Sequence, residues 1–282
     1  MSSPDQRETR PSRRPRGRPR KDPTDGSPAT AQALDRGLTL LSMVAAQQRI
    51  GLSELATQAE MPPSTAHRLL STMQRHGVVE FDEEAQQWLI GIETFRMGNS
   101  YLKRSNLIEA SRDAMRRLME DTGETSNLGI ADEGDVVFVS QVESHNPIRA
   151  FFRPGTRGAL HASGIGKALL AELPHDEVAA ILERKGMATL TANTLDTPDA
   201  LFADLATARK RGWALDDEEH HAGMRCVAAP VFNRYGEVVA GISISGPTVR
   251  FAQSQLDAIG TRVKAAADAI TQEIGGIRSV GG

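Results

Sequence analysis

The chain has 282 residues, a formal net charge of −3 and one cysteine, Cys226, a composition typical of a globular protein with room for two modest domains. A single cysteine excludes an intrachain disulfide and fits a reducing compartment. Because no apolar run is long enough to cross a bilayer and the N-terminus lacks the apolar core of a signal peptide, we expect a cytoplasmic protein without a membrane partner.

Residues 1–29 differ in composition from the rest of the chain. They are rich in Pro, Arg and Ser without hydrophobic periodicity, which predicts a disordered tail. Residues 1–21 hold eight Lys or Arg against two Asp or Glu, so the basic charge is concentrated there. The segment "RGRP", with Arg16 and Arg18, resembles an AT-hook, which lies in the narrow minor groove of A·T-rich DNA. The alternative is a tail that is merely solvated.

Residues 30–91 have the element order of a winged helix-turn-helix. Apolar spacing predicts a helix over 31–47, and Ser53 is a natural N-cap for a short second helix. A third helix follows in "MPPSTAHRLLSTMQRHG", with proline near its start and Gly77 just past its end. Two short strands, 78–81 and 87–90, flank an acidic turn and complete the predicted DNA-binding domain.

The third helix has two different faces. At 100° per residue, its apolar side chains cluster on one side and its polar side chains on the other. The outer face carries hydroxyls, cations and an imidazole but no carboxylate: Ser64, His67, Arg68, Ser71 and Arg75, with Thr65 and Thr72 beside them. Such a face can enter a major groove, where arginine reads guanine, so we predict that these residues bind DNA. The alternative is an ordinary solvated helix face.

The rest of the chain alternates helices and strands. Residues 92–106 are predicted to form a linker helix, residues 107–275 a second domain, and residues 276–282 a flexible tail. Helices are expected at 107–122, from "SGIGKALLAELP" onward, and at 174–185, 201–211 and 254–274; strands are expected at 125–131, 135–142, 148–152 and twice within 224–247. This pattern predicts an α+β domain with a mainly antiparallel sheet.

Three blocks in the second domain carry a family resemblance. They are "LHASGIGKALLAELP", "RGWALDDEEHHAGMRCVAAPVF" and "GEVVAGISISGP". In this order, behind a winged helix, they resemble the IclR-type transcriptional regulators over about residues 30–275. The resemblance implies a GAF-like effector-binding domain, a double-stranded DNA operator as partner, a homotetramer built as a dimer of dimers, and neither enzymatic activity nor a cofactor.

The chain is also similar to the family members that sense glyoxylate or pyruvate. The resemblance implies an effector site at the positions that match their motifs: Gly164, Ile165, Asp216, Cys226, Ser243 and Ser245, with Met224 and Ala150 as walls. The chemistry suits a small carboxylate. Backbone N–H groups that open a helix attract an anion, and two serines spaced two apart on a strand present both hydroxyls to one face.

Smaller side chains than in the pyruvate-sensing relatives stand at two positions, Ala150 and Gly158. A pocket wall with less apolar surface favours glyoxylate over pyruvate, because glyoxylate has no methyl group. A roomier pocket for a larger acid, such as an aromatic acid, is the alternative.

Catalysis and zinc binding are the alternative functions that residues near Cys226 suggest. Cys226 with His220 or His221 and Asp216 has the composition of a nucleophile, base and orienting acid, but nothing marks the thiol as activated. The "EEHH" segment with Cys226 offers ligand types that zinc accepts, but adjacent histidines point in different directions on regular structure. We therefore assign no catalytic or metal-binding residue. A metabolite-binding module that does not act on DNA is a further alternative.

Overall fold

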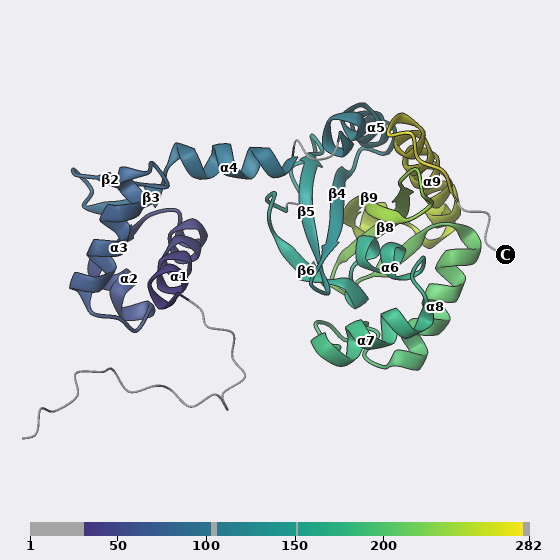
Figure 1. Ribbon diagram of the computed structural model, residues 1–282. Helices are drawn as coiled ribbons and strands as arrows, with labels where there is room; N and C mark the ends of the chain where they lie inside the picture. Colours follow the sequence, from purple (N-terminus) through teal and green to yellow (C-terminus); the bar gives the residue numbers. More distant parts are fainter. Residues whose placement is uncertain (1–30, 103–105, 151, 279–282) are drawn as a thin grey trace, which may run out of the picture. The chain divides into compact units, whose positions relative to one another are not determined.

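The computed structural model describes residues 31–102, 106–150 and 152–278 of the chain (Figure 1). The chain divides into two compact units, Met1–Gly98 and Asn99–Gly282. The predicted tail with Arg16 and Arg18 lies outside the described residues. In the described part, no helix is both long enough and apolar enough to cross a membrane.

The first unit consists of helices and a small antiparallel sheet of strand order β1-β3-β2. Its elements in chain order are α1 (Gln32–Gln47), β1 (Ile50–Gly51), α2 (Leu52–Gln58), α3 (Pro63–Arg75), β2 (Val79–Asp82) and β3 (Gln87–Ile90), followed by α4 (Ile92–Leu102), which begins in this unit. The order of three helices and a two-stranded wing is the predicted winged helix-turn-helix.

The core of the first unit lies under the inner face of α3. Ala66 and Leu70 of α3 are fully buried against apolar side chains of α1 and α2 and against Trp88 of the wing. Helix α1 packs on this core through Gly37, Leu40 and Val44. Leu34 and Leu38 of the same helix are 62% and 55% exposed.

The predicted N-cap at Ser53 is wrong by two residues. Helix α2 begins at Leu52, so Gly51 is the N-cap residue and makes no side-chain capping bond. The reason is tertiary: Ile50 and Gly51 are held extended by pairing with β3, and the helix starts where that pairing ends. Ser53 lies inside the helix, where its carbonyl accepts a hydrogen bond from the Thr57 hydroxyl.

The second unit is built on a six-stranded antiparallel sheet of order β6-β5-β4-β9-β8-β7. Its strands are β4 (Thr125–Asp132), β5 (Asp135–Val142), β6 (Arg157–Ala159), β7 (Ala214–Asp217), β8 (Met224–Phe232) and β9 (Val238–Pro247). Its helices are α5 (Leu107–Thr122), α6 (Gly164–Leu170), α7 (His175–Lys185), α8 (Pro198–Arg211) and α9 (Leu256–Glu273), with short 3-10 turns at Leu160–Ala162, Thr248–Arg250 and Gln253–Gln255. The predicted α+β class with an antiparallel sheet is confirmed.

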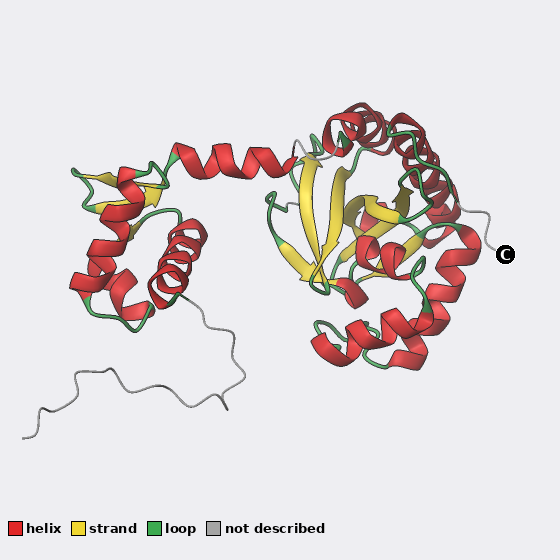
Figure 2. Cartoon of the chain, in the orientation of Figure 1, coloured by secondary structure: helices red, strands yellow, loops and turns green. Residues whose placement is uncertain are grey.

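Helices cover both faces of this sheet (Figure 2). One face packs against α5 and α9, whose buried Met115 and Val263 meet Val227 and Ile244 of the central strands. The other face packs against α6, with α7 and α8 beyond it. Because side chains alternate along a strand, apolar residues at 242 and 244 leave 243 and 245 on the α6 face.

Two strand assignments from sequence need correction. The strand predicted at 148–152 is absent: Ile148–Ala150 and Phe152 are irregular, and Ile148 is 71% exposed. The edge partner of β5 is instead β6, through the pairs Val136 with Gly158 and Val137 with Arg157. Strand β7, which sequence analysis did not identify, adds to the opposite edge, because its four residues are too few to show a period.

The predicted linker helix and the predicted C-terminal tail also differ from expectation. The predicted linker helix corresponds to α4, Ile92–Leu102, and its predicted last residue, Asn106, lies in a turn before α5; residues 103–105 lie outside the described residues. The first residues of the predicted flexible tail are held in place, since the Gly276 amide donates to the carbonyl of Thr271 and the Ile277 amide to that of Asn233. Residues 279–282 lie outside the described residues.

Candidate functional site

Three polar side chains form a row across the α6 face of the second unit's sheet. Asp216 on β7 pairs with Cys226 on β8, and Cys226 pairs with Ser245 on β9. Ser243 lies two residues from Ser245 on the same face and is fully buried. The antiparallel register therefore gathers four predicted site residues that the sequence separates by up to 29 positions.

Helix α6 begins directly on this row. A Cβ added at Gly164 would lie 2.8 Å from the Cys226 sulfur and 3.0 Å from the Cys226 carbonyl oxygen, so only glycine permits the approach. Ile165 packs over the glycines at 129 and 241, where an added Cβ would lie 3.3 Å and 2.9 Å, respectively, from the nearest Ile165 atom. The turn is closed by the Ser163 hydroxyl, which accepts a hydrogen bond from the Gly166 amide at 3.1 Å.

A cavity of about 200 Å³ lies against the row. Its walls combine parts of the sheet with two irregular segments: Arg149, Ala150, Phe152, Asp216, His220, His221, Met224, Arg225, Cys226 and Ser245. The walls therefore include five of the eight predicted effector residues, Asp216, Cys226, Ser245, Met224 and Ala150. Gly164, Ile165 and Ser243 lie behind this wall and are not among the lining residues.

The wall is more apolar than the sequence indicated. Phe152 lines it and stacks on Phe138 with ring centroids 4.4 Å apart. The space left by Gly158 is filled by His220, whose Nε2 would lie 3.2 Å from a Cβ at position 158. A small residue at 158 thus makes room for an imidazole rather than for the ligand. Phe152 was missed because its segment was predicted to be a regular strand.

Asp216 is a buried carboxyl with an unusual titration. It is 6% exposed, and its Oδ1 accepts hydrogen bonds from the amides of Glu219 at 2.7 Å and His220 at 3.2 Å. Burial raises the pKa of Asp216 to about 7, the charge of Glu219 adds to the rise, and the two amides and Lys167 only partly offset it. This carboxyl is therefore poised between its acid and its anion near neutrality.

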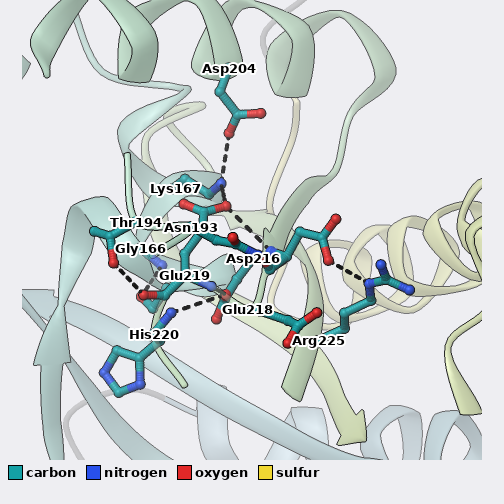
Figure 3. A network of polar contacts seen from close by, with 12 residues as sticks. Gly166, Lys167, Asn193, Thr194, Asp204, Asp216, Glu218, Glu219, His220 and Arg225 are labelled. Carbon is teal, nitrogen blue, oxygen red and sulfur yellow. Dashed lines mark hydrogen bonds and ion pairs between the residues drawn. The ribbon is translucent and has the colours of Figure 1, made fainter. Parts of the chain in front are cut away.

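An ion-pair network that sequence analysis did not predict links α6 to the loop that carries His220 and His221 of the cavity wall. Figure 3 shows this network. Lys167 of α6 is fully buried, with its Nζ 2.5 Å from Glu219 and 2.8 Å from Asp204 of α8. Glu219 lies in the loop after β7, directly before His220 and His221. The signal was present in the sequence: one lysine in the apolar helix "GIGKALL" must find partners if the helix is buried.

The thiol and the imidazole of the cavity are both electrically neutral. Burial raises the pKa of Cys226 to about 11, with the charge of Asp216 as the next cause. Burial also lowers the pKa of His220 to about 4, with His221 and His161 adding to the effect. A protonated thiol is a poor nucleophile, so this geometry does not favour catalysis by Cys226. No three His, Cys, Asp or Glu side chains gather as metal ligands within the described ranges.

The outer face of α3 in the first unit is open. Among the seven predicted DNA-binding residues of this helix, Thr65 and Ser71 are half-buried and the others are exposed: Ser64, His67, Arg68, Thr72 and Arg75. No carboxylate of the described chain forms an ion pair with Arg68 or Arg75. Thr72 donates its hydroxyl proton to the Arg68 carbonyl at 2.9 Å, which leaves only its lone pairs for other partners.

Both units match models of one protein family. Residues 33–83 match the IclR helix-turn-helix domain, and residues 99–272 match the bacterial transcriptional regulator IclR C-terminal domain. The chain belongs to the IclR family of transcriptional regulators. The members of this family to which it is similar are regulators rather than enzymes, so the IclR-family chain is a DNA-binding regulator and not a catalyst.

Relatives of this IclR-family protein are similar over most of their length. It is 49% identical over 236 residues to the HTH-type transcriptional regulator BhcR of Paracoccus denitrificans, which covers 84% of this chain and 85% of the relative. It is 42% identical over 269 residues to the transcriptional repressor IclR of Escherichia coli, with 94% and 98% covered. The crystal structure of Thermotoga maritima IclR superposes with a TM-score of 0.74 at 28% identity, covering 87% of this chain and all of that one.

Proposed function

We propose that this regulator binds its operator with an affinity set by a small carboxylate, most specifically a 2-oxo acid such as glyoxylate. The observation that carries the proposal is the row of Asp216, Cys226 and Ser245 on the wall of a cavity. Hydroxyl, thiol and carboxyl groups offer several hydrogen bonds to a ligand with few atoms. The ligand acts by binding two conformations of the protein with different affinity.

The cavity size also supports a second ligand class. About 200 Å³ corresponds to roughly six or seven water molecules. A two-carbon acid would share this space with water, whereas a planar aromatic acid would fill more of it beside Phe152. Calorimetric titrations of the protein with glyoxylate, pyruvate and benzoate distinguish the two ligand classes.

We propose that the outer face of α3 reads the operator. Its exposed Arg68 and Arg75 are free of carboxylate partners in the described chain, and the helix carries no acid. Arginine can donate two hydrogen bonds to guanine in the major groove, while hydroxyls contact phosphates. As the resemblance implies, we further propose a dimer of dimers, which agrees with the exposed apolar side chains Leu34 and Leu38 on α1 and Phe95 on α4.

Replacing both serines, Ser243→Ala with Ser245→Ala, is expected to abolish the effect of the ligand on operator affinity. In the wild type we expect glyoxylate to change this affinity by about 5-fold or more, within the usual range of allosteric coupling. The double variant loses the Ser245 hydroxyl from the cavity wall and the buried Ser243 hydroxyl next to it on β9, but no part of the DNA-binding unit. Its operator affinity without ligand should therefore stay within about twofold of the wild type.

Fluorescence anisotropy with DNA from upstream of the gene measures this response. Ser126→Ala is the matched control: Ser126 is also a buried serine of the central sheet, but it alternates with Asn127 and lies on the opposite face. The control should respond as the wild type does. A full response by the double variant would mean that the effector binds elsewhere.

Deleting residues 1–29 is expected to reduce the salt dependence of DNA binding more than its sequence preference. A basic segment that neutralises phosphates contributes about 0.9 to the slope of log affinity against log salt for each one. The slope is measured on operator and scrambled DNA from 50 to 200 mM salt. An unchanged slope would mean that the tail, including Arg16 and Arg18, does not neutralise DNA phosphates.

A further inference from the structure

The cationic side chains near the cavity are already paired. Arg149 lies 2.8 Å from Glu143, and Arg225 donates to Asp217 at 2.6 Å. Lys167, below the loop, is held between two carboxylates. Among the described residues, a carboxylate ligand that enters this cavity therefore meets no unpaired lysine or arginine. It does meet the carboxyl of Asp216, and two anions at hydrogen-bond distance repel each other.

The two oxygens of Asp216 have different roles. Oδ1 accepts hydrogen bonds from the amides of Glu219 and His220, whereas Oδ2 has no hydrogen-bond partner among the described residues. Asp216 lines the cavity. A neutral carboxyl group has one O–H donor, and with Oδ1 occupied as an acceptor the proton belongs on Oδ2.

We infer that Asp216 binds the effector as a neutral carboxylic acid, with its Oδ2 hydroxyl donating a hydrogen bond to the ligand's carboxylate, so that binding above neutral pH takes up a proton. The inference rests on the proposed function, because it concerns how that cavity holds an anion. It makes Asp216 a selective element: an anion that accepts a hydrogen bond is bound, and a ligand that can only donate one is not.

The surroundings of Asp216 favour this protonation. Cys226 faces it from β8 with a neutral thiol, and the adjoining loop places Glu219, His220 and His221 nearby. Lys167 of α6 is paired both with Glu219 and with Asp204 of α8. Burial already places the pKa of Asp216 near 7 without a ligand, and an added anion raises it further.

Calorimetry of the full-length protein with glyoxylate tests the inference. Titrations in buffers of different ionisation enthalpy count the protons bound. We expect almost no uptake at pH 5.5, where Asp216 is already protonated, and uptake approaching one proton at pH 8.5. The affinity should be constant below pH 6 and fall by up to about tenfold per pH unit well above pH 7.

Asp216→Asn is the decisive variant, because the amide keeps an acceptor for the two backbone N–H groups and a donor in place of the hydroxyl. It should bind glyoxylate at pH 5.5 about as tightly as the wild type and keep this affinity at pH 8.5 without proton uptake. His220→Gln and His221→Gln remove the neighbouring titratable groups and should leave uptake unchanged. Circular dichroism establishes that each variant is folded.

Several outcomes overturn the inference. They are wild-type binding at pH 8.5 without proton uptake, uptake that persists in Asp216→Asn, uptake that disappears in either histidine variant, and failure of folded Asp216→Asn to bind at pH 5.5. Failure of the proposed function looks different. In that case the wild type binds none of glyoxylate, pyruvate and benzoate even at pH 5.5, and the role of Asp216 is rejected with it.

Discussion

Lys167→Met is expected to lower the free energy of unfolding of the second unit by about 3–5 kcal/mol. The lysine is fully buried and its Nζ lies 2.5 Å from the carboxylate of Glu219, which is itself 5% exposed. Burial raises the pKa of Glu219 while Lys167 opposes the rise. Without the lysine, a buried carboxylate must either remain charged without a partner or take up a proton, and both cost free energy.

Denaturant unfolding followed by tryptophan fluorescence measures this loss. The chain has two tryptophans, Trp88 in the first unit and Trp213 in the second, so a Trp88→Phe background leaves Trp213 as the reporter of the second unit. Lys167→Met combined with Glu219→Gln removes both charges and should recover much of the loss. Asp204→Asn is the matched single control and should cost less, because the Asp204 side chain is 27% exposed.

The same variant links stability to ligand binding. Glu219 lies directly before His220 and His221 in the loop that lines the cavity, so this loop should loosen and glyoxylate affinity should fall with it. If Lys167→Met unfolds at the wild-type denaturant concentration, the ion pair does not stabilise the unit, and the buried network has another role.

Arg68→Ala is expected to weaken specific operator binding by about 1–3 kcal/mol, or roughly 5- to 150-fold. Arg68 is exposed on the outer face of α3 without a carboxylate partner in the described chain. If its guanidinium reads a guanine edge, removing it affects the operator more than unrelated DNA. Loss of a phosphate contact would weaken both alike.

Anisotropy titrations with operator and scrambled duplexes at one fixed salt concentration separate these effects. Arg36→Ala is the matched control, because Arg36 is an exposed arginine of the same unit on α1 rather than on α3. We expect it to change operator affinity by less than about twofold. If Arg68→Ala lowers the affinity for both duplexes equally, Arg68 contacts the DNA backbone rather than a base. If neither affinity falls, Arg68 does not contact the DNA.

The elements that local patterns define were largely predictable. Helix α3 was identified with its inner and outer faces because a 3.6-residue period is written in consecutive residues. The strand at 148–152 was predicted wrongly because that prediction, too, used only a local pattern. A short apolar run forms a strand only if the edge of a neighbouring strand is free to pair with it. Here the outer edge of β5 is already paired with β6.

The sequence by itself therefore determined the family blocks, the order of the two units, the inner and outer faces of α3 and the placement of Ser243 and Ser245 on one side of a strand. Only the tertiary structure decided which side chains meet. The register of β7, β8 and β9 brings Asp216 to Cys226 and Ser245, and Lys167 finds Glu219 across 52 residues of chain. Contacts of this kind depend on long-range pairing and on the burial of charge, and neither leaves a period in the local sequence.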